Sequence, residues 1–173
     1  MPITELVTLL ANIALTLTFL VGLVFGLAQV RAVERDRRER LTLETLRNFQ
    51  TRDFAELLRF VIDPAFPKSR QEFDALPLAQ HVMYIQFSQQ MESLGILVAE
   101  NFIDVDLIEK TLGSFVLTSW KKYDAVFSQI RPTDPYIGEY FQWLAERIEE
   151  RSKTHKREPF YVIGKGRHLR VFS

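Results

Sequence analysis

The feature that most constrains this chain is an uncharged, apolar stretch of 25 residues near its N-terminus, from position 6 to position 30. The stretch contains 15 Leu, Ile, Val or Phe residues, and its polar members carry no charge. On a membrane-insertion scale these side chains favour the bilayer by about 5–9 kcal/mol. As a helix the stretch is about 37 Å long, enough for a hydrocarbon core of about 30 Å with some tilt. The sequence therefore predicts a transmembrane helix within residues 1–30.

Two other interpretations of this stretch are a cleaved signal peptide and the buried helix of a soluble core. A signal peptide has a basic segment, a shorter apolar run and a small-residue cleavage site. Here Glu5 is the only ionisable side chain before Arg31, and the run ends in Gln29-Val30-Arg31. Core helices of soluble proteins rarely run this far without a charge. We therefore favour a membrane span.

The flanking charges predict the orientation of the span. No Lys or Arg precedes it, whereas six Arg lie within residues 31–50. Because positive charge is retained on the inner side, we expect a single-pass protein with the N-terminus outside and the C-terminal domain in the cytoplasm. Five of the six form a juxtamembrane basic set: Arg31, Arg35, Arg37, Arg38 and Arg40. Such side chains can meet anionic lipid at about 1 kcal/mol each, so the lipid bilayer is the first expected partner.

The span also carries a stripe of small residues. These are Ala14, Thr18, Gly22 and Gly26, spaced four apart and therefore on one helix face. Gly22 and Gly26 form the motif that lets two membrane helices approach closely. The stripe indicates either self-association or a partner helix, or else an incidental lipid-facing surface.

Past the span, the sequence predicts an all-α architecture. A charged juxtamembrane stalk helix over residues 31–50 continues the span to about Asn48, with Glu34 spaced to pair with Arg38 and Asp36 with Arg40. A small cytoplasmic helical bundle is expected over residues 51–152. Thr51 is expected to cap a short helix that ends near Ile62, and the capping box of Ser69 and Glu72 is expected to open a single turn before Pro77. Three longer helices are expected to follow: from Leu78 to Val98, from an N-cap at Asp104 to about Ile130, and from Asp134-Pro135 to about Arg151.

The longest bundle helices show broad apolar faces. In the helix over residues 78–98 we expect the face to consist of Met83, Phe87, Met91, Leu94 and Val98, widened by Leu78, Val82 and Ile85. Gly95 lies within this face and predicts a point of close packing.

The end of the chain differs from the bundle. Residues 151–173 hold seven basic residues and one acid, whereas residues 71–130 hold three basic and eight acidic ones. We expect residues 153–173 to form a short basic tail, extended or hairpin-like. It could dock on the acidic bundle, remain disordered or lie on the membrane; we expect no nucleic acid as a partner.

Several packing residues carry a resemblance to a known family. In order they are Phe49 and Phe54, Met91-Glu92-Ser93-Leu94-Gly95-Ile96-Leu97-Val98, Phe102-Ile103-Asp104, Trp120, and Ile130-Arg131. Together with the span and the basic stalk, this order resembles a family of uncharacterised bacterial proteins. The resemblance implies one N-terminal transmembrane helix and a cytosolic all-helical domain of unknown function, and it implies that the membrane is the bacterial inner (plasma) membrane. It matches Glu92, Gly95, Asp104, Trp120 and Arg131 to recurring family positions, and it implies no catalytic role.

The sequence offers little for catalysis. The chain has no Cys, so it has no disulfide framework and no thiolate nucleophile. Its three His, at positions 81, 155 and 168, do not have the spacing of a zinc site, and no phosphate-binding loop or nucleophile motif occurs. We expect no cofactor, no metal and no enzymatic activity.

Glu92, Arg131 and Trp120 are candidates for a structural or ligand-binding role. Glu92 lies in an apolar-rich helix; if it is buried there it needs a partner, for which Arg131 is a candidate. We favour a structural ion pair over a proton-transfer role. Trp120 belongs to an aromatic set that is more typical of a core or an interface than of a ligand cage.

Two functional hypotheses follow. The first is a membrane-anchored, non-enzymatic interaction module, acting as an accessory subunit of a membrane complex or as a homo-oligomer. It would contact a protein partner or a second copy through the transmembrane helix and the helical domain. The alternative is a membrane-tethered sensor or regulator whose helical domain binds a small ligand or nucleotide.

Overall fold

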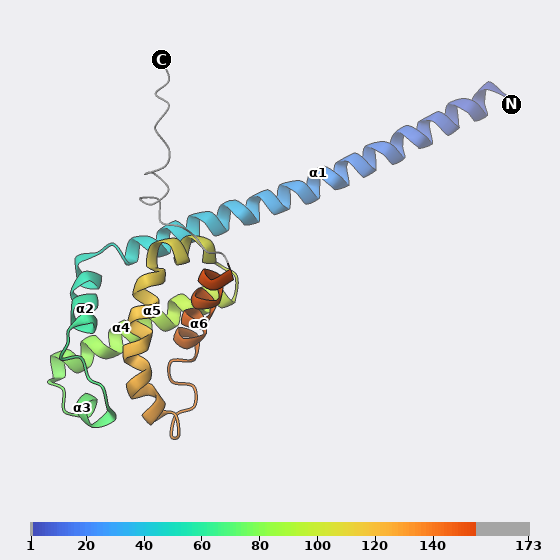
Figure 1. The fold of residues 1–173 in the computed structure, drawn as a ribbon. Coiled ribbons are helices and arrows are strands. Elements are labelled where there is room, and N and C mark those ends of the chain that lie inside the picture. Colours follow the sequence, from blue (N-terminus) through green and yellow to red (C-terminus); the bar gives the residue numbers. More distant parts are fainter. Residues whose placement is uncertain (1, 155–173) are drawn as a thin grey trace, which may run out of the picture.

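A single long helix dominates the computed structural model, which describes residues 2–154 (Figure 1). Helix α1 (Ile3–Asn48) is continuous over 46 residues and projects far from the rest of the chain. Its most apolar window has a mean hydropathy of 2.2, and none of that window is buried. By length and composition it is the one helix among the described residues able to cross a membrane. Its exposure separates it from a core helix of a soluble protein.

The other five helices form a compact bundle, which we call the body. They are α2 (Arg52–Ile62), α3 (Arg70–Asp74), α4 (Leu78–Ala99), α5 (Val105–Ile130) and α6 (Glu139–Thr154). Helix α4 makes its largest interface with α6, α5 packs against α6, and α2 packs against α4. No strand occurs within residues 2–154, so the predicted all-α fold with a long N-terminal helix is confirmed. The predicted hairpin-like tail lies outside the described residues from position 155 onward.

Local side-chain caps start three of these helices where the sequence predicts them. The Thr51 hydroxyl accepts a hydrogen bond from the Phe54 backbone N–H at 3.2 Å, and the Ser69 hydroxyl accepts one from Glu72 at 3.2 Å. A carboxylate oxygen of Asp104 accepts from the Asp106 N–H at 2.7 Å. Each cap satisfies a donor that the first helical turn leaves free.

The predicted apolar face of α4 is partly wrong. Leu78, Val82 and Ile85 do not widen the buried face; they are 81%, 52% and 43% exposed. At 100° per residue these positions lie about 140–180° around the helix from Phe87, which is fully buried. The neighbouring helices cover only the Phe87 side, where the buried residues are Tyr84, Phe87, Met91, Leu94, Gly95 and Val98.

The body is filled by aromatic rings contributed by four helices and a loop. The ring of Tyr123 lies 5.7 Å from that of Phe87, 5.6 Å from that of Phe141 and 4.3 Å from that of Tyr84. Phe66, in the loop after α2, stacks on Tyr84 at 5.3 Å. Offset and edge-on contacts of this kind stabilise a core beyond the area that they bury.

Two buried tyrosines in this core have unequal hydrogen bonds. The Tyr123 hydroxyl donates to the Tyr84 backbone carbonyl at 2.8 Å, whereas the Tyr84 hydroxyl is buried with no hydrogen-bond partner. Burial raises the pKa of both phenols above the ordinary value of 10.0. Since the folded state favours the neutral phenols, the contribution of these two groups to the free energy of unfolding is fully present below pH 10.0 and is lost as the pH rises above it.

We therefore expect opposite results from the same substitution at these two positions. Tyr123→Phe removes the donor to the Tyr84 carbonyl and should lower the free energy of unfolding by about 1 kcal/mol. Tyr84→Phe removes an unpartnered buried hydroxyl and should leave stability unchanged or raise it. Urea unfolding of the full chain in detergent, followed by tryptophan fluorescence, measures both. Equal losses in the two variants would contradict the assigned hydrogen bond.

Candidate functional site

The most distinctive site of the molecule is the corner where α1 meets the body. Thr42 is fully buried there, although threonine is polar. Its hydroxyl donates to the Arg38 carbonyl at 2.7 Å and accepts from the Asp104 backbone N–H at 2.9 Å. One turn later, Leu46 enters the core cluster of the body. The end of α1 is thus docked on the body and is part of its core.

The loop between α4 and α5 forms the other side of this corner. Asn101 adopts a left-handed backbone with φ of 60°. The Phe102 N–H bonds to the Leu97 carbonyl at 2.9 Å and the Asn101 N–H to the Val98 carbonyl at 3.0 Å, which completes a Schellman cap. The cap presents the Asn101 side-chain carbonyl to the Arg38 guanidinium, which also reaches the Ile103 carbonyl at 3.4 Å. Arg38 therefore ties the stalk to this loop.

We expect Thr42→Val to loosen this junction. Valine has the shape of threonine but accepts no hydrogen bond, so the Asp104 N–H loses its acceptor at a cost of about 1–3 kcal/mol. Hydrogen exchange on the full chain should then show the Asp104 amide exchanging about tenfold faster or more. The control is Thr45→Val, at a half-buried position three residues further along α1. Unchanged exchange in Thr42→Val would contradict the role assigned to its hydroxyl.

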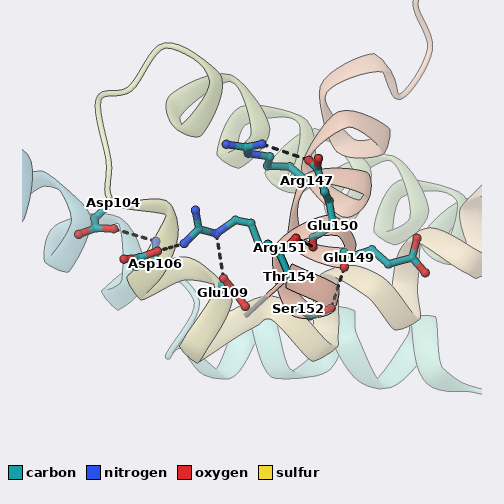
Figure 2. Close-up of polar contacts among 9 residues, drawn as sticks. All are labelled: Asp104, Asp106, Glu109, Arg147, Glu149, Glu150, Arg151, Ser152 and Thr154. Atoms are coloured by element: carbon teal, nitrogen blue, oxygen red, sulfur yellow. Dashed lines mark hydrogen bonds and ion pairs between the residues drawn. The ribbon is translucent and has the colours of Figure 1, made fainter. Parts of the chain in front are cut away.

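An ion-pair cluster fastens the end of α6 to the start of α5, as Figure 2 shows. The Arg151 guanidinium contacts the Asp106 carboxylate and lies 2.9 Å from that of Glu109. Arg151 and Glu109 are each 21% exposed, so this cluster is better shielded than the surface pairs of the body. It also places a cation at the C-terminus of one helix and an anion in the first turn of another, as the helix dipoles favour.

Two hollows open at the junction. The first, which we call the stalk notch, has a volume of about 520 Å³ and lies between α1 and the α4–α5 loop. It is lined by Arg31, Glu34, Arg35, Arg37, Arg38, Leu41, Glu100, Asn101 and Phe102. The second, which we call the α6 cleft, has a volume of about 560 Å³. It is lined by Arg38, Val98, Ala99, Asn101, Val105, Trp143, Glu146, Arg147 and Glu150.

The juxtamembrane basic set divides between two places. Four of its five Arg line the stalk notch, whereas Arg40 points elsewhere and pairs with Glu44 at 3.9 Å. The predicted pairing of Glu34 with Arg38 and of Asp36 with Arg40 is wrong. Arg38 instead donates a hydrogen bond to Asn101 in the α4–α5 loop, and Arg40 pairs with Glu44. Arg35 instead bonds to Glu39 at 2.8 Å, which raises the pKa of Arg35.

The small-residue stripe lies on the free part of α1. Ala14, Thr18, Gly22 and Gly26 are all exposed, and the Thr18 hydroxyl donates to the Ala14 carbonyl at 2.8 Å. No atom lies within 4 Å of the place that a Cβ would take at Gly22 or Gly26. The face is therefore open along its length.

Glu92 has a different partner from the one predicted. Its two carboxylate oxygens accept from the backbone N–H groups of Tyr140 and Phe141 at 3.0 and 2.9 Å. Among the described residues no ion pair joins Glu92 to Arg131. Glu92, on α4, thus supplies the N-terminal cap of α6, where a carboxylate also favours the helix dipole.

Gly95 lies one turn beyond Glu92 and allows α6 to come this close. A Cβ at Gly95 would stand 2.3 Å from the Tyr140 carbonyl oxygen and 2.7 Å from its carbon. The predicted close-packing role of this glycine thus corresponds to a contact between the backbones of α4 and α6.

Arg131 and Trp120 support the same region. The Arg131 guanidinium lies 5.6 Å from the Trp120 ring and 3.5 Å from the Ile137 carbonyl. The predicted start of the last helix at Asp134-Pro135 is wrong, since α6 begins at Glu139. Gly138 has φ of +67°, which turns the chain immediately before α6, and a Cβ there would stand 2.4 Å from the Phe127 ring.

The described residues offer no metal-binding group of three His, Asp or Glu side chains. The His81 ring makes an edge-on contact with Phe73 at 4.2 Å. His155 and His168 lie outside the described residues. The junction of α1 with the body therefore offers the cationic stalk notch and the α6 cleft, whose lining residues carry both signs of charge.

Comparison with known proteins adds a family but no activity. A family described as a domain of unknown function, DUF4760, matches residues 16–148. The match takes in most of the apolar stretch, the stalk and nearly all of the body. No curated protein and no solved structure matches this chain.

Proposed function

We propose that this chain, which belongs to the DUF4760 family, is a membrane-anchored, non-enzymatic interaction module that holds a helical body against the membrane surface. In this role it is an accessory subunit of a membrane complex or the protomer of a homo-oligomer. The N-terminus lies outside, and the body lies in the cytoplasm beneath a bacterial inner membrane, as the Arg that follow the apolar stretch favour.

The observation that carries the proposal is the continuity of α1 from its bare apolar part into the body. The apolar stretch ends at Val30, and Arg38 already bonds to the α4–α5 loop. These positions are eight residues apart, which is about 12 Å along a helix. A span that ends at Val30 therefore leaves the body no room to move away from the lipid headgroups.

Membrane extraction and protease protection test this anchoring. We expect the full chain, expressed in a bacterium, to stay in the membrane after alkaline carbonate washing, and the body to be protected from protease added to spheroplasts. Val21→Arg with Val24→Arg places two charges inside the stretch, at about 2.5–3.5 kcal/mol each, and should release the chain. The matched control is Val33→Arg with Leu43→Arg, two equally exposed positions beyond the stretch. Release of the unmodified chain would overturn the proposal.

The small-residue stripe is the proposed contact between copies or with a partner helix. We expect Gly22→Leu with Gly26→Leu to reduce the assembled mass in mild detergent, because bulky side chains keep two backbones apart. Val24→Leu with Ala28→Leu, at exposed positions four residues apart on the opposite face of α1, serves as the control. An assembly of unchanged mass in the glycine variant would exclude the stripe from the contact.

The α6 cleft favours a second candidate function, a membrane-tethered sensor that binds a small ligand. In this cleft Arg38, Trp143, Glu146 and Arg147 converge at the junction with the stalk, where a ligand could alter how α1 docks. Extraction of the full chain from its native membrane in mild detergent separates the two candidates. A co-purifying protein supports the interaction module, and a retained small molecule supports the sensor.

A further inference from the structure

The stalk notch carries more positive charge than the protein itself neutralises. Four Arg line it against two acidic residues, Glu34 and Glu100, and one of the four, Arg35, pairs with Glu39 outside the notch. Among the described residues no ion pair within 4.0 Å involves Arg31 or Arg37. The Nε of Arg38 is buried without an acceptor, although its Nη2 has two. A notch of this composition attracts an anion.

The two walls of the notch come from segments far apart in sequence. Arg31, Arg35 and Arg38 follow one another at helical spacings of four and three, so they share a face of α1. The opposite wall is the α4–α5 loop, with Asn101 and Phe102. Because Arg31 and Phe102 line the same hollow, the notch extends along α1 from this loop toward the end of the apolar stretch.

The position of the notch along α1 matches the depth of lipid phosphates. Arg31 directly follows the apolar stretch, and Arg38 lies about 10 Å further along the helix. The headgroup layer of a bilayer occupies about 5–7 Å beyond each side of the hydrocarbon core, so the end of the notch near Arg31 lies within this layer. Phe102 is 54% exposed beside these Arg, as is typical of an apolar side chain that enters the interface.

We propose that the stalk notch is a binding site for the phosphate group of an anionic membrane lipid, an inference that rests on the proposed membrane anchoring. Guanidinium groups recognise phosphate through paired N–H donors, and this site offers those of Arg31 and Arg37 together with the Nε of Arg38, whereas Arg35 already pairs with Glu39. A bound headgroup joins the stalk to the α4–α5 loop and fixes the body against the bilayer. Free inorganic phosphate offers the same chemistry and is the competing source.

Hydrogen exchange in nanodiscs tests the site. The full chain is placed in nanodiscs of phosphatidylcholine alone, and of phosphatidylcholine mixed equally with phosphatidylglycerol. We expect the backbone amides of residues 100–104 to exchange about tenfold more slowly in the anionic discs. Arg31→Gln with Arg37→Gln should abolish this difference. The matched control, Arg52→Gln with Arg59→Gln, removes the same charge from α2 and should retain the difference.

Each other outcome overturns the proposal in a recognisable way. Equal exchange in the two kinds of disc, or an equal loss of the difference in both double variants, excludes a headgroup site at the notch. Slower exchange with millimolar phosphate in phosphatidylcholine discs assigns the site to free phosphate. Failure of the chain to co-elute with nanodiscs is a separate result, and it refutes the membrane anchoring itself.

Discussion

Replacement of Gly95 by alanine should lower the free energy of unfolding of the body by about 2–3 kcal/mol. The new methyl group would stand 2.3 Å from the Tyr140 carbonyl oxygen and 2.7 Å from its carbon, and these are backbone atoms that cannot rotate aside. Helix α6 would have to retreat from α4, across the largest helix interface of the body. Helix propensity favours alanine by about 1 kcal/mol, which offsets only part of this cost.

Gly113→Ala is the matched control, because it is also a buried glycine inside a body helix. There a methyl group would meet the Ile148 Cγ2 at 3.3 Å and the Glu109 Cγ at 3.7 Å, and both atoms belong to side chains that can shift slightly. We expect Gly113→Ala to remain within about 1 kcal/mol of the unmodified chain. Urea unfolding of the full chain in detergent compares the two, and equal stabilities would show that α4 and α6 do not approach as described.

The second large effect is expected at Glu92. Glu92→Ala leaves the Tyr140 and Phe141 N–H groups without their acceptor, at a cost of about 2 kcal/mol. Glu92→Gln keeps an acceptor of similar shape but loses the charge that favours the helix N-terminus, so about 1 kcal/mol should be lost. Thermal unfolding followed by circular dichroism gives the order of the three proteins. A glutamine variant less stable than the alanine variant would contradict this assignment.

Glu56→Ala provides the control for Glu92. Glu56 forms an exposed pair with Arg52 on α2, so its removal should change stability by less than about 0.5 kcal/mol. The double variant of Glu92 and Gly95 should cost less than the sum of the two single variants. Both residues act on the contact between α4 and the start of α6, so once one substitution has displaced α6 the other removes less.

Much of the fold could be predicted because the relevant signals are local. Thr51, Ser69 and Asp104 each bond to a backbone donor two or three residues ahead, so a short window of sequence contains the whole interaction. The apolar stretch is likewise a signal that one continuous segment of sequence contains in full. These features do not depend on what packs against them.

The cap of α6 could not be predicted in this way, because its two halves lie 48 residues apart. The dipeptide Asp134-Pro135 has the composition of a helix start, and the Asp134 carboxylate does accept from the Tyr136 N–H at 3.2 Å. It forms a local turn, and the helix begins only after Gly138. A cap supplied by another helix leaves no spacing signal in the sequence of α6.

The resemblance to uncharacterised family members identified residues whose partners only the fold reveals. Glu92, Gly95, Trp120 and Arg131 all lie around the start of α6 and the loop before it. These four residues therefore belong to one packing arrangement, which explains why the resemblance indicated a fold and implied no reaction. The residues of the junction, Thr42 and Asn101, carried no motif, because ordinary polar residues there gain their role from burial and backbone conformation.

The unbroken helix from the apolar stretch to Thr42 also sets the direction in which the body faces around the axis of α1. A helix turns by about 100° per residue, so the direction in which the body faces is set by the number of residues between Val30 and Thr42. One residue inserted there would swing the body about a quarter of a turn around the axis of α1, whereas seven would restore its heading to within about 20°. In the proposed membrane-anchored arrangement, a rotation of α1 within the bilayer would turn the body by the same angle, because α1 is continuous from Ile3 to Asn48.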